Sequence, residues 1–380
     1  MPEDTVTSMT DLPDDCLLMI FRRLESCADS DSFGLTCRRW LQIQCLGRGS
    51  LQLRSSYRPN VSQEYVRCLS KLLMRFQRLD SITLTGCTEL PDLALTQLQF
   101  YGFNLKTLSL DCCFGITDDG LAMVAKGCPS LVTISLYRCN ITDVGLEILA
   151  KSCFHLENVN LSYCVLVSDR GIRAFSRYCH RLRAMTVSYC RGITGSGFRG
   201  CSPTLSYLEA DSCSLTPEGL LGAVSGGGLQ YLNVSCLRCW VGGDGLSGIG
   251  EGYAARLQYL NFRLCRFVGD ESVEAIAKGC PALKEWNLAV CHEIRVRGWD
   301  AIGLHCRNLE ILHVNRCRNL CNRGLLAIQD GCERLGVLYM HGCRRVNYVG
   351  LESFKRMRWK VRIRGEEHMC VGPSLDKFFC

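Results

Sequence analysis

The stretch "LKTLSLDCCFGITDDGLAMVAKGCPS", residues 105–130, decides the fold of this chain. Leu108 and Leu110 are two positions apart, the spacing that points both side chains to one face of a β-strand. Leu121 and Val124 follow at the i, i+3 spacing of one helix face. The stretch therefore predicts a short strand followed by a helix.

The same pattern recurs along most of the chain. Its opening leucine returns at intervals of 23 to 28 residues, and "AKGCPSL" (125–131) reappears almost unchanged as "AKGCPAL" (277–283). The eleven repeat starts are Leu79, Leu105, Leu131, Leu156, Leu182, Leu205, Leu229, Leu257, Leu283, Leu309 and Leu335. A period of this length is typical of an array in which each unit is stable only against its neighbours.

Local signals place the ends of the units and of the array. Four residues have the N-cap chemistry expected just before a helix: Thr117, Thr142, Ser168 and Thr216. "KVRIR" (360–364) alternates apolar and charged residues, as a protected edge strand does, and "SLQLRSS" (50–56) is typical of a degenerate first repeat. Glycine-rich segments at 226–228 and 242–252, with two short repeats from Leu182 and Leu205, predict shortened or missing helices mid-array.

The chain has 28 cysteines, and most follow the repeat. One row lies eight residues after the opening leucine: Cys87, Cys113, Cys139, Cys164, Cys190, Cys213, Cys265, Cys291, Cys317 and Cys343. A second row closes the helices: Cys128, Cys153, Cys179, Cys280, Cys306 and Cys332. Zinc needs four converging ligands, whereas equivalent positions of parallel strands form a line. We interpret the rows as buried packing residues and the lone pair Cys236 and Cys239 as structural, and we predict no metal site.

Motifs that could carry other chemistry are explained by the repeat. "GDGLSG" (243–248), followed by Asp270, fits a dinucleotide-binding fingerprint, but Gly245 and Asp270 occupy the same repeat positions as Gly120 and Asp118. A phosphate-binding loop, a G-x-S-x-G nucleophile motif and an H-E-x-x-H zinc motif are absent from the sequence. We expect no cofactor and no enzymatic activity.

The composition and charge of the chain limit the classes of protein to which it can belong. The chain has 380 residues, 47% hydrophobic and 21% charged, and it contains no run of eighteen apolar residues. Its start, "MPEDTVTSMTDLPDD", lacks a secretory signal, so we expect reduced thiols, no membrane span, and a location in the cytoplasm, the nucleus or both. The net charge is 44 − 37 = +7, and eight basic residues against one acid lie between Arg344 and Arg364. Because that run falls on the predicted cap and contains no motif of a known nucleic-acid-binding module, nucleic-acid binding is not favoured.

Residues 79–360 resemble the leucine-rich repeat, specifically its cysteine-containing class. The resemblance implies an α/β solenoid shaped as a horseshoe, with parallel strands on the concave face and helices on the convex face. Residues 46–78 would then be a linker with a degenerate capping repeat, and 361–380 a carboxy-terminal cap and tail.

The head of the chain carries a second resemblance. In "LPDDCLLMIFRRLESCADSDSFGLTCRRWLQIQ" (12–44), Leu17, Ile20, Phe21 and Leu24 form one apolar helical stripe that needs a partner surface. Leu-Pro at the start, the Ile-Phe pair and "CRRW" resemble an F-box, most closely that of plant proteins. The F-box would be a small all-α domain over 1–45. Gly34 is unfavourable in its second helix by about 1 kcal/mol.

The F-box resemblance implies a function. Proteins with an F-box followed by leucine-rich repeats are substrate-recognition subunits of SCF-type cullin-RING ubiquitin ligases, whose F-box docks on a Skp-type adaptor. By that resemblance the adaptor contact, or the packing beneath it, falls to Leu12, Pro13, Leu17, Ile20, Phe21 and Trp40. The alternative is a scaffold or small-ligand sensor that uses the same repeats without coupling to degradation.

The concave face would bind the protein target. Its outward strand positions hold Tyr137, Arg138, Tyr163, Tyr189, Tyr207, Tyr231, Tyr259, Arg263, His313, Arg316, Tyr339 and His341. Tyrosine and arginine are enriched in binding hot spots. Because acids lie toward the first half and basic residues in the second, we hypothesise that the second half receives an acidic or phosphorylated segment of the target. The alternative is a solvated polar face with no special role for any one residue.

Overall fold

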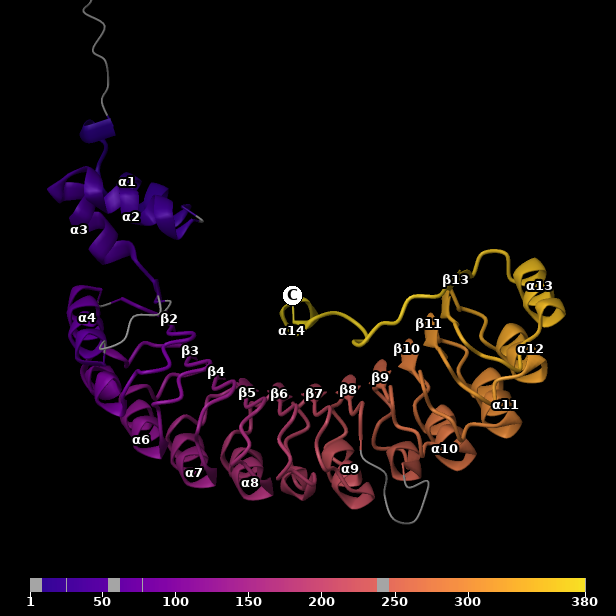
Figure 1. Cartoon of the computed structure of the whole chain (residues 1–380). Helices are drawn as coiled ribbons and strands as arrows, with labels where there is room; N and C mark the ends of the chain where they lie inside the picture. Colours follow the sequence, from indigo (N-terminus) through magenta and orange to yellow (C-terminus); the bar gives the residue numbers. More distant parts are fainter. Residues whose placement is uncertain (1–8, 25, 54–61, 77, 238–245, 380) are drawn as a thin grey trace, which may run out of the picture.

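A computed structural model describes residues 9–24, 26–53, 62–76, 78–237 and 246–379. Thirteen short strands in this part of the chain pair in parallel and in sequence order, forming one open sheet. The strands are β1 (Ser50–Gln52), β2 (Ser81–Thr83), β3 (Thr107–Ser109), β4 (Thr133–Ser135), β5 (Asn158–Asn160), β6 (Ala184–Thr186), β7 (Tyr207–Glu209), β8 (Tyr231–Asn233), β9 (Tyr259–Asn261), β10 (Glu285–Asn287), β11 (Ile311–His313), β12 (Val337–Tyr339) and β13 (Arg362–Arg364). Figure 1 shows them lining the inside of an arc, with the helices outside; the expected horseshoe is confirmed.

The outer layer is helical. Its elements are α4 (Ser62–Arg75), η2 (Asp92–Gln97), α5 (Leu98–Tyr101), α6 (Asp118–Gly127), α7 (Asp143–Ser152), α8 (Asp169–Tyr178), η3 (Ser196–Phe198), α9 (Pro217–Val224), η4 (Ser247–Gly250), α10 (Asp270–Gly279), α11 (Val296–His305), α12 (Asn322–Gly331) and α13 (Tyr348–Met357). Among the described residues, the repeat from Leu182 has only the 3₁₀ turn η3 on its outer side and the repeat from Leu229 only η4, so the predicted loss of helix in the middle is confirmed for this part of the chain.

One continuous core lies between the strands and the helices. The central residue of each strand points into it: Leu108, Ile134 and Val159 are in register on β3, β4 and β5, and all three are buried. Stacking thus gives each unit the apolar contacts that it could not supply alone.

Side chains at the helix starts join neighbouring units. The predicted N-caps Thr117, Thr142, Ser168 and Thr216 each accept a hydrogen bond from a backbone N–H in the first turn of the following helix. Ser168 also donates to Oδ2 of Asp143 in the preceding repeat at 2.5 Å. Asp270 plays the same part, accepting from the N–H groups of Arg295 (2.7 Å) and Gly298 (3.0 Å). Its role is therefore a bond between repeats, as the period predicts.

The cysteine rows are buried within the array, and many of their thiols bond to backbone carbonyls. The Sγ atoms of Cys113, Cys139 and Cys190 donate to backbone carbonyls of the preceding repeat, each at 3.0 Å. In the second row, Cys153 donates to the carbonyl of Cys128 at 3.3 Å. These thiols fill space too narrow for larger side chains and tie successive units together.

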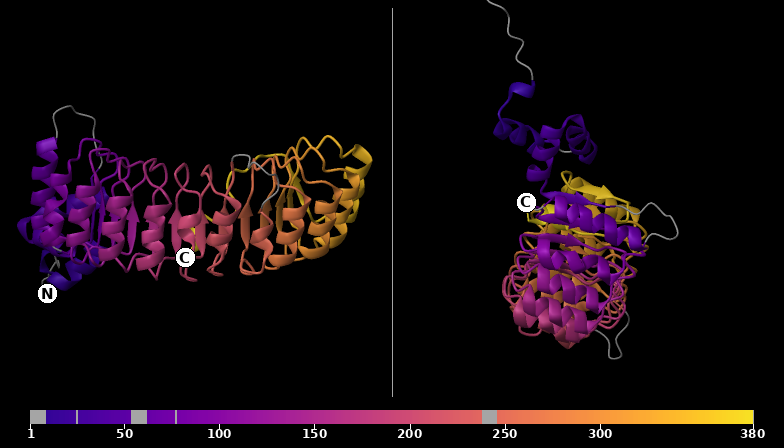
Figure 2. Two further views of the ribbon diagram at one scale, coloured as in Figure 1. Left: turned by 90° about the horizontal axis from the view of Figure 1, so that it is seen from below. Right: turned by 90° about the vertical axis from the view of Figure 1, so that its left-hand side faces the viewer.

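A short helical module precedes the array, and a tail follows it. The module consists of η1 (Met9–Asp11), α1 (Asp14–Arg22), α2 (Cys27–Thr36) and α3 (Arg38–Gly47). After β13 the chain turns back across the concave side and ends in α14 (Leu375–Phe378), over the middle of the sheet (Figures 1 and 2). Within the described chain, every helix is too short or too polar to cross a bilayer.

Candidate functional site

The helical module has its own small core. Leu17, Phe21, Phe33 and Ile43 are buried in it, and Trp40 stacks on Phe33 with ring centroids 4.3 Å apart. Leu17 and Phe21 therefore lie beneath the surface of the module, whereas Trp40 is only partly buried and packs at the edge of this core.

The second helix forms despite its glycine. α2 runs through Gly34, where an added Cβ would collide with the side chain of Gln44 on α3. Gln44 lies close enough to donate through Nε2 to the carbonyl of Ser30, at 2.8 Å. The cost of glycine in the helix is thus offset by the close approach of α2 and α3.

Other apolar side chains of the module face solvent. Pro13 is exposed, and Leu12 and Ile20 are partly buried. Met19 and Leu35 are 63% and 84% exposed, and the sequence analysis missed both. Leu35 follows Gly34. With a regular helix assumed through this glycine, Leu35 would have been placed on the exposed face of the helix. Met9 of η1 and Leu46 of α3 are also exposed, at 50% and 52%, so apolar side chains of the module reach solvent at several points.

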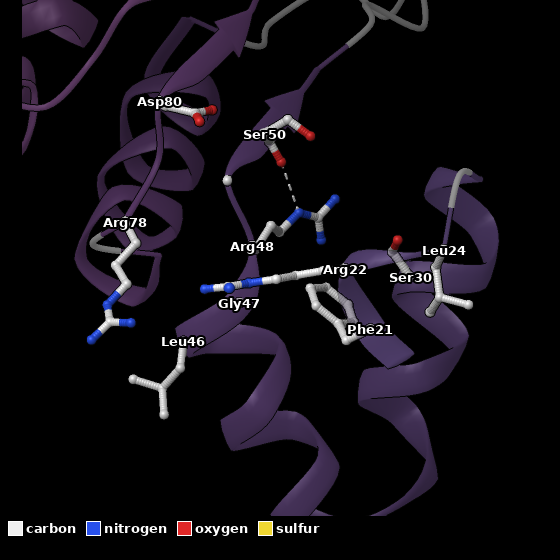
Figure 3. Close-up of a pocket in the computed structure, with 11 residues that line it drawn as sticks. Phe21, Arg22, Leu24, Ser30, Leu46, Gly47, Arg48, Ser50, Arg78 and Asp80 are labelled. Carbon is white, nitrogen blue, oxygen red and sulfur yellow. Dashed lines mark hydrogen bonds between the residues drawn. The ribbon is translucent and has the colours of Figure 1, made fainter. Parts of the chain in front are cut away.

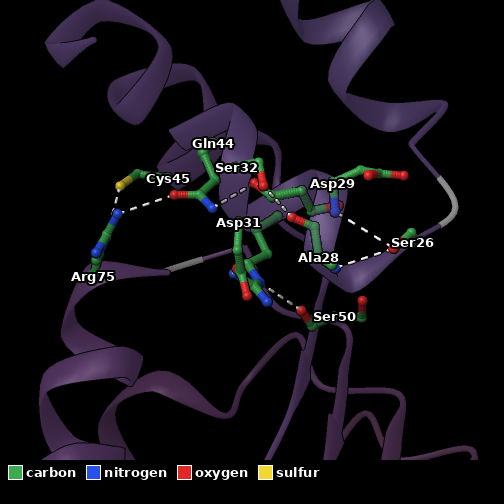
Figure 4. A network of polar contacts seen from close by, with 11 residues as sticks. Ser26, Ala28, Asp29, Asp31, Ser32, Gln44, Cys45, Ser50 and Arg75 are labelled. Carbon is green, nitrogen blue, oxygen red and sulfur yellow. Dashed lines mark hydrogen bonds and ion pairs between the residues drawn. The ribbon is translucent and has the colours of Figure 1, made fainter. Parts of the chain in front are cut away.

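Two arginines fix the module to the array (Figure 4). Arg75 of α4 donates to Oε1 of Gln44 at 3.0 Å and to Sγ of Cys45 at 3.2 Å. Arg48 pairs with Asp31 at 2.7 Å and donates to the carbonyl of Ser50 at 3.1 Å. We call this set of contacts between the module and the array the joint. The side chain of Arg48 is largely buried in it, so the joint is an ordered contact between α2, α3 and β1.

An open cleft of about 470 Å³ lies beside this joint. Figure 3 shows Phe21 and Leu24 on the module side and Arg78 and Asp80 on the array side. Its walls come from both parts of the chain, and they bring no set of catalytic side chains together. We assign it to the joint.

The first half of the concave face is open. Tyr137, Tyr163 and Tyr189 form a ladder, with ring centroids 5.3 Å and 4.3 Å apart, and the Arg138 guanidinium lies 5.8 Å from the Tyr163 centroid. Tyr163 and Tyr189 are exposed. Partial desolvation and the neighbouring Tyr189 raise the pKa of Tyr163. The ladder is therefore an exposed aromatic surface on the first half of the concave face.

The second half of the concave face is covered by the chain's own tail. Tyr207, Tyr231, His313 and Tyr339 lie on the concave strands as predicted, but the expectation that they face solvent is wrong: their exposed fractions are 3%, 1%, 1% and 8%. Phe378 packs on Tyr207 and Tyr231, and His368 packs on Tyr339. Burial also raises the pKa of Tyr207 and Tyr231 far above the ordinary value.

The predicted basic residues of this half already hold a carboxylate. Glu367 of the tail lies 2.9 Å from Nε of Arg316 and 3.5 Å from a terminal nitrogen of Arg263. Tyr259 is partly buried beside Gly372, whereas His341 stays exposed beyond the tail.

In the described part of the chain, no group of three His, Cys, Asp or Glu side chains is placed to hold a metal ion. Cys239 and Gly245 lie outside the described residues, so the C-x-x-C pair and the glycine motif have no structural description here.

Comparison with known proteins identifies both parts. An F-box-like family model matches residues 9–45, and a leucine-rich-repeat model matches residues 127–150, 152–176 and 256–277. The chain is 55% identical over 291 residues to F-box/LRR-repeat protein 12 of Arabidopsis thaliana, covering 74% of this chain and 73% of that protein. It is 26% identical over 171 residues to coronatine-insensitive protein homolog 1a of Oryza sativa subsp. japonica, covering 34% of this chain and 27% of that protein.

Solved structures share the fold alone. An internalin from Listeria monocytogenes superposes with a TM-score of 0.57 at 14% identity, covering 94% of this chain and 95% of that one. TLR13, in its complex with ssRNA13, superposes with a TM-score of 0.56 at 14% identity, covering 80% of this chain and 41% of that one.

Proposed function

The chain belongs to the F-box/leucine-rich-repeat family, and we propose that it is the substrate-recognition subunit of an SCF-type cullin-RING ubiquitin ligase. Its helical module would dock on a Skp-type adaptor, and the concave face of its repeats would hold the protein to be ubiquitinated. The chain itself would be non-catalytic, acting by bringing the target near the ligase's catalytic subunit. It would work in the cytoplasm, the nucleus or both.

One observation supports this proposal: the F-box-like module is joined to the leucine-rich-repeat array by a set of hydrogen bonds and an ion pair. The bonds of Arg75 to Gln44 and of Arg48 to Asp31 hold the module against the first repeat. A fixed joint favours proximity catalysis, because a bound target then stays at a defined distance from the adaptor.

The exposed apolar residues of the module are the adaptor surface that we propose. Pro13, Met19 and Leu35 present apolar side chains to solvent, and Leu12 and Ile20 are partly buried. Leu17 and Phe21 would support this surface from within, and Trp40 from the edge of the small core.

The test is binding of the full chain to a recombinant plant Skp-type adaptor by calorimetry. We expect saturable binding, which Leu35→Asp together with Met19→Asp weakens at least about ten-fold, or about 1.4 kcal/mol. The matched control is Leu304→Asp on α11, where a leucine that is 65% exposed, close to the 63% of Met19, lies far from the module. A folded chain that binds no adaptor of this class would refute the proposal.

A further inference from the structure

The concave side of β9–β11 holds an extended peptide, which is the chain's own tail. Three buried asparagines read its backbone: Nδ2 of Asn261 donates to the carbonyl of Met369 at 2.7 Å, Nδ2 of Asn287 to that of His368 at 3.2 Å, and Nδ2 of Asn315 to that of Glu366 at 2.9 Å. Hydrogen bonds to main-chain carbonyls do not depend on the peptide's side chains. This row of amides can therefore hold other extended segments.

Two of the three asparagines are pre-arranged for this contact. Oδ1 of Asn261 accepts from the N–H of Arg263 at 3.0 Å, and Oδ1 of Asn287 accepts from the N–H of Ala289, also at 3.0 Å. These two amide oxygens are thus bound within their own repeats, which orients each Nδ2 toward the middle of the concave side, whereas Oδ1 of Asn315 is buried without a hydrogen-bond partner. Asn160, at the equivalent position of β5, is only partly buried and donates instead to Ser135 of the neighbouring strand.

Three further contacts of this surface are made to side chains of the bound peptide and depend on their chemistry. Arg316 and Arg263 hold the Glu367 carboxylate, at 2.9 and 3.5 Å. Val371 is 2% exposed in a cluster with Tyr207 and Tyr231.

The third contact is aromatic. The Phe378 ring lies 5.3 Å from that of Tyr207, 6.2 Å from that of Tyr231 and 6.3 Å from that of Tyr259. The surface therefore accepts a carboxylate at one end and an aromatic ring at the other.

The tail is bound in a way that permits exchange. Most of its residues, from Glu366 to Cys370, are exposed on their outer side, and the polar groups that it covers can bond to water once it leaves. Tethering gives the tail an effective concentration in the millimolar range, so that a competitor must offer equivalent contacts.

We propose that this surface, on β7 to β12, is the target-binding site, that the tail occupies it in the free chain, and that a target displaces the tail. The target presents an extended segment with a carboxylate for Arg263 and Arg316 and an aromatic side chain for Tyr207 and Tyr231. This inference rests on the proposed function, since it names the part of the array that a target contacts.

The test uses the full chain with its tail bound or released. Gly372 has φ +61°, and a Cβ there would lie 2.5 Å from Cδ1 of Tyr259, so Gly372→Val displaces the tail while leaving the repeats intact. The probe is a fluorescent peptide of residues 365–379 with Cys370 replaced by Ser, followed by anisotropy. We expect at least ten-fold tighter binding to the Gly372→Val chain than to the wild type.

Two controls define the site. Gly86→Val introduces the same residue at another left-handed glycine (φ +76°), in the repeat that starts at Leu79 and away from the tail, and should leave peptide binding at the wild-type level. A probe with Lys in place of Glu367 should bind the Gly372→Val chain at least ten-fold more weakly. The same loss is expected when Arg263→Ala and Arg316→Ala are added to that chain.

Equal binding to the wild-type and Gly372→Val chains would overturn the inference. So would the absence of saturable binding to a folded Gly372→Val chain at probe concentrations up to about 1 mM, the range of tethered effective concentrations. Adaptor binding is measured on the same samples. Loss of adaptor binding with normal peptide exchange refutes only the proposed function, and the reverse result refutes only the tail's role.

Discussion

The backbone N–H of Gly372 donates a hydrogen bond to Oε2 of Glu285 at 2.7 Å, which joins the tail to β10 across 87 residues of sequence. The other carboxylate oxygen, Oε1, lies 2.7 Å from Nε2 of His313 on the neighbouring strand. Glu285 therefore links the tail to the sheet and gives Nε2 of the buried His313 its hydrogen-bond partner.

Replacement of Glu285 by Ala should loosen the tail. His313 would lose its bonded partner in a buried site, and we expect the free energy of unfolding to fall by about 1–3 kcal/mol. The measurement is the rate of trypsin cleavage after the exposed Lys377, followed by mass spectrometry, which should rise roughly ten-fold. Asp111→Ala, at a concave carboxylate that bonds to Ser135 and Tyr137 instead, is the control and should leave this rate unchanged.

The cysteine rows should be inert to alkylation in the folded chain. Burial raises the pKa of Cys128 and of Cys190 to about 12, so at pH 8 only about one thiol in ten thousand is ionised. Iodoacetamide should label the exposed Cys16 and Cys68 first. Peptide mapping measures this order, with a urea-unfolded sample as the positive control.

The same pKa shifts make stability depend on pH. Because these thiols ionise from their ordinary pKa of 9.0 in the unfolded chain but only near 12 in the folded one, their contribution to the free energy of unfolding is complete below pH 9. That contribution should fall as the pH rises from 9 toward 12, measured by urea unfolding. An unfolding midpoint that is constant across this window would contradict the shifts.

The bond between Asp143 and Ser168 should act as a coupled unit. Asp143 accepts from the N–H of Ser168 at 2.8 Å, from its hydroxyl at 2.5 Å and from the N–H of Gly171 at 3.0 Å. Asp143→Ala should cost about 1.5–3 kcal/mol, and combining it with Ser168→Ala should show a coupling energy of about 1 kcal/mol in thermal or urea unfolding. The control pairs Ser168→Ala with Asp119→Ala, an exposed acid at the start of α6, and should be additive within about 0.5 kcal/mol.

Two glycines in helices should respond to alanine with opposite signs. A Cβ at Gly324 in α12 would lie 2.8 Å from Cδ1 of the fully buried Trp299, and we expect Gly324→Ala to destabilise the chain by about 1–3 kcal/mol. At Gly222 in α9 the nearest atom would be the carbonyl oxygen of Gly195, at 3.5 Å. Gly222→Ala should therefore stabilise by up to about 1 kcal/mol, through the higher helix propensity of alanine. Equal shifts in unfolding midpoint would show that packing on Trp299 has no effect.

The regular parts of the fold could be predicted because their causes are local. A spacing of two in Leu108 and Leu110 predicts a strand, and a hydroxyl at Thr142 predicts a helix start; both arise within a few residues. The buried, carbonyl-bonded state of Cys113 follows from the same period, since each unit meets a copy of itself. The horseshoe, the weakened middle and the F-box resemblance were all accessible in this way.

What the sequence by itself determined is which face of each strand a residue occupies, because side-chain direction follows from the period of the chain. What only the tertiary structure decided is what covers that face. Tyr231 and His313 point to the concave side as predicted, yet they are buried, because a non-repeating tail returns across the sheet and meets Glu285 from 87 positions away. No period relates the two partners of such a contact, and it forms only because stacking has already placed Asn261 and Asn287 in register and has brought Asn315, two residues beyond β11, to the same peptide.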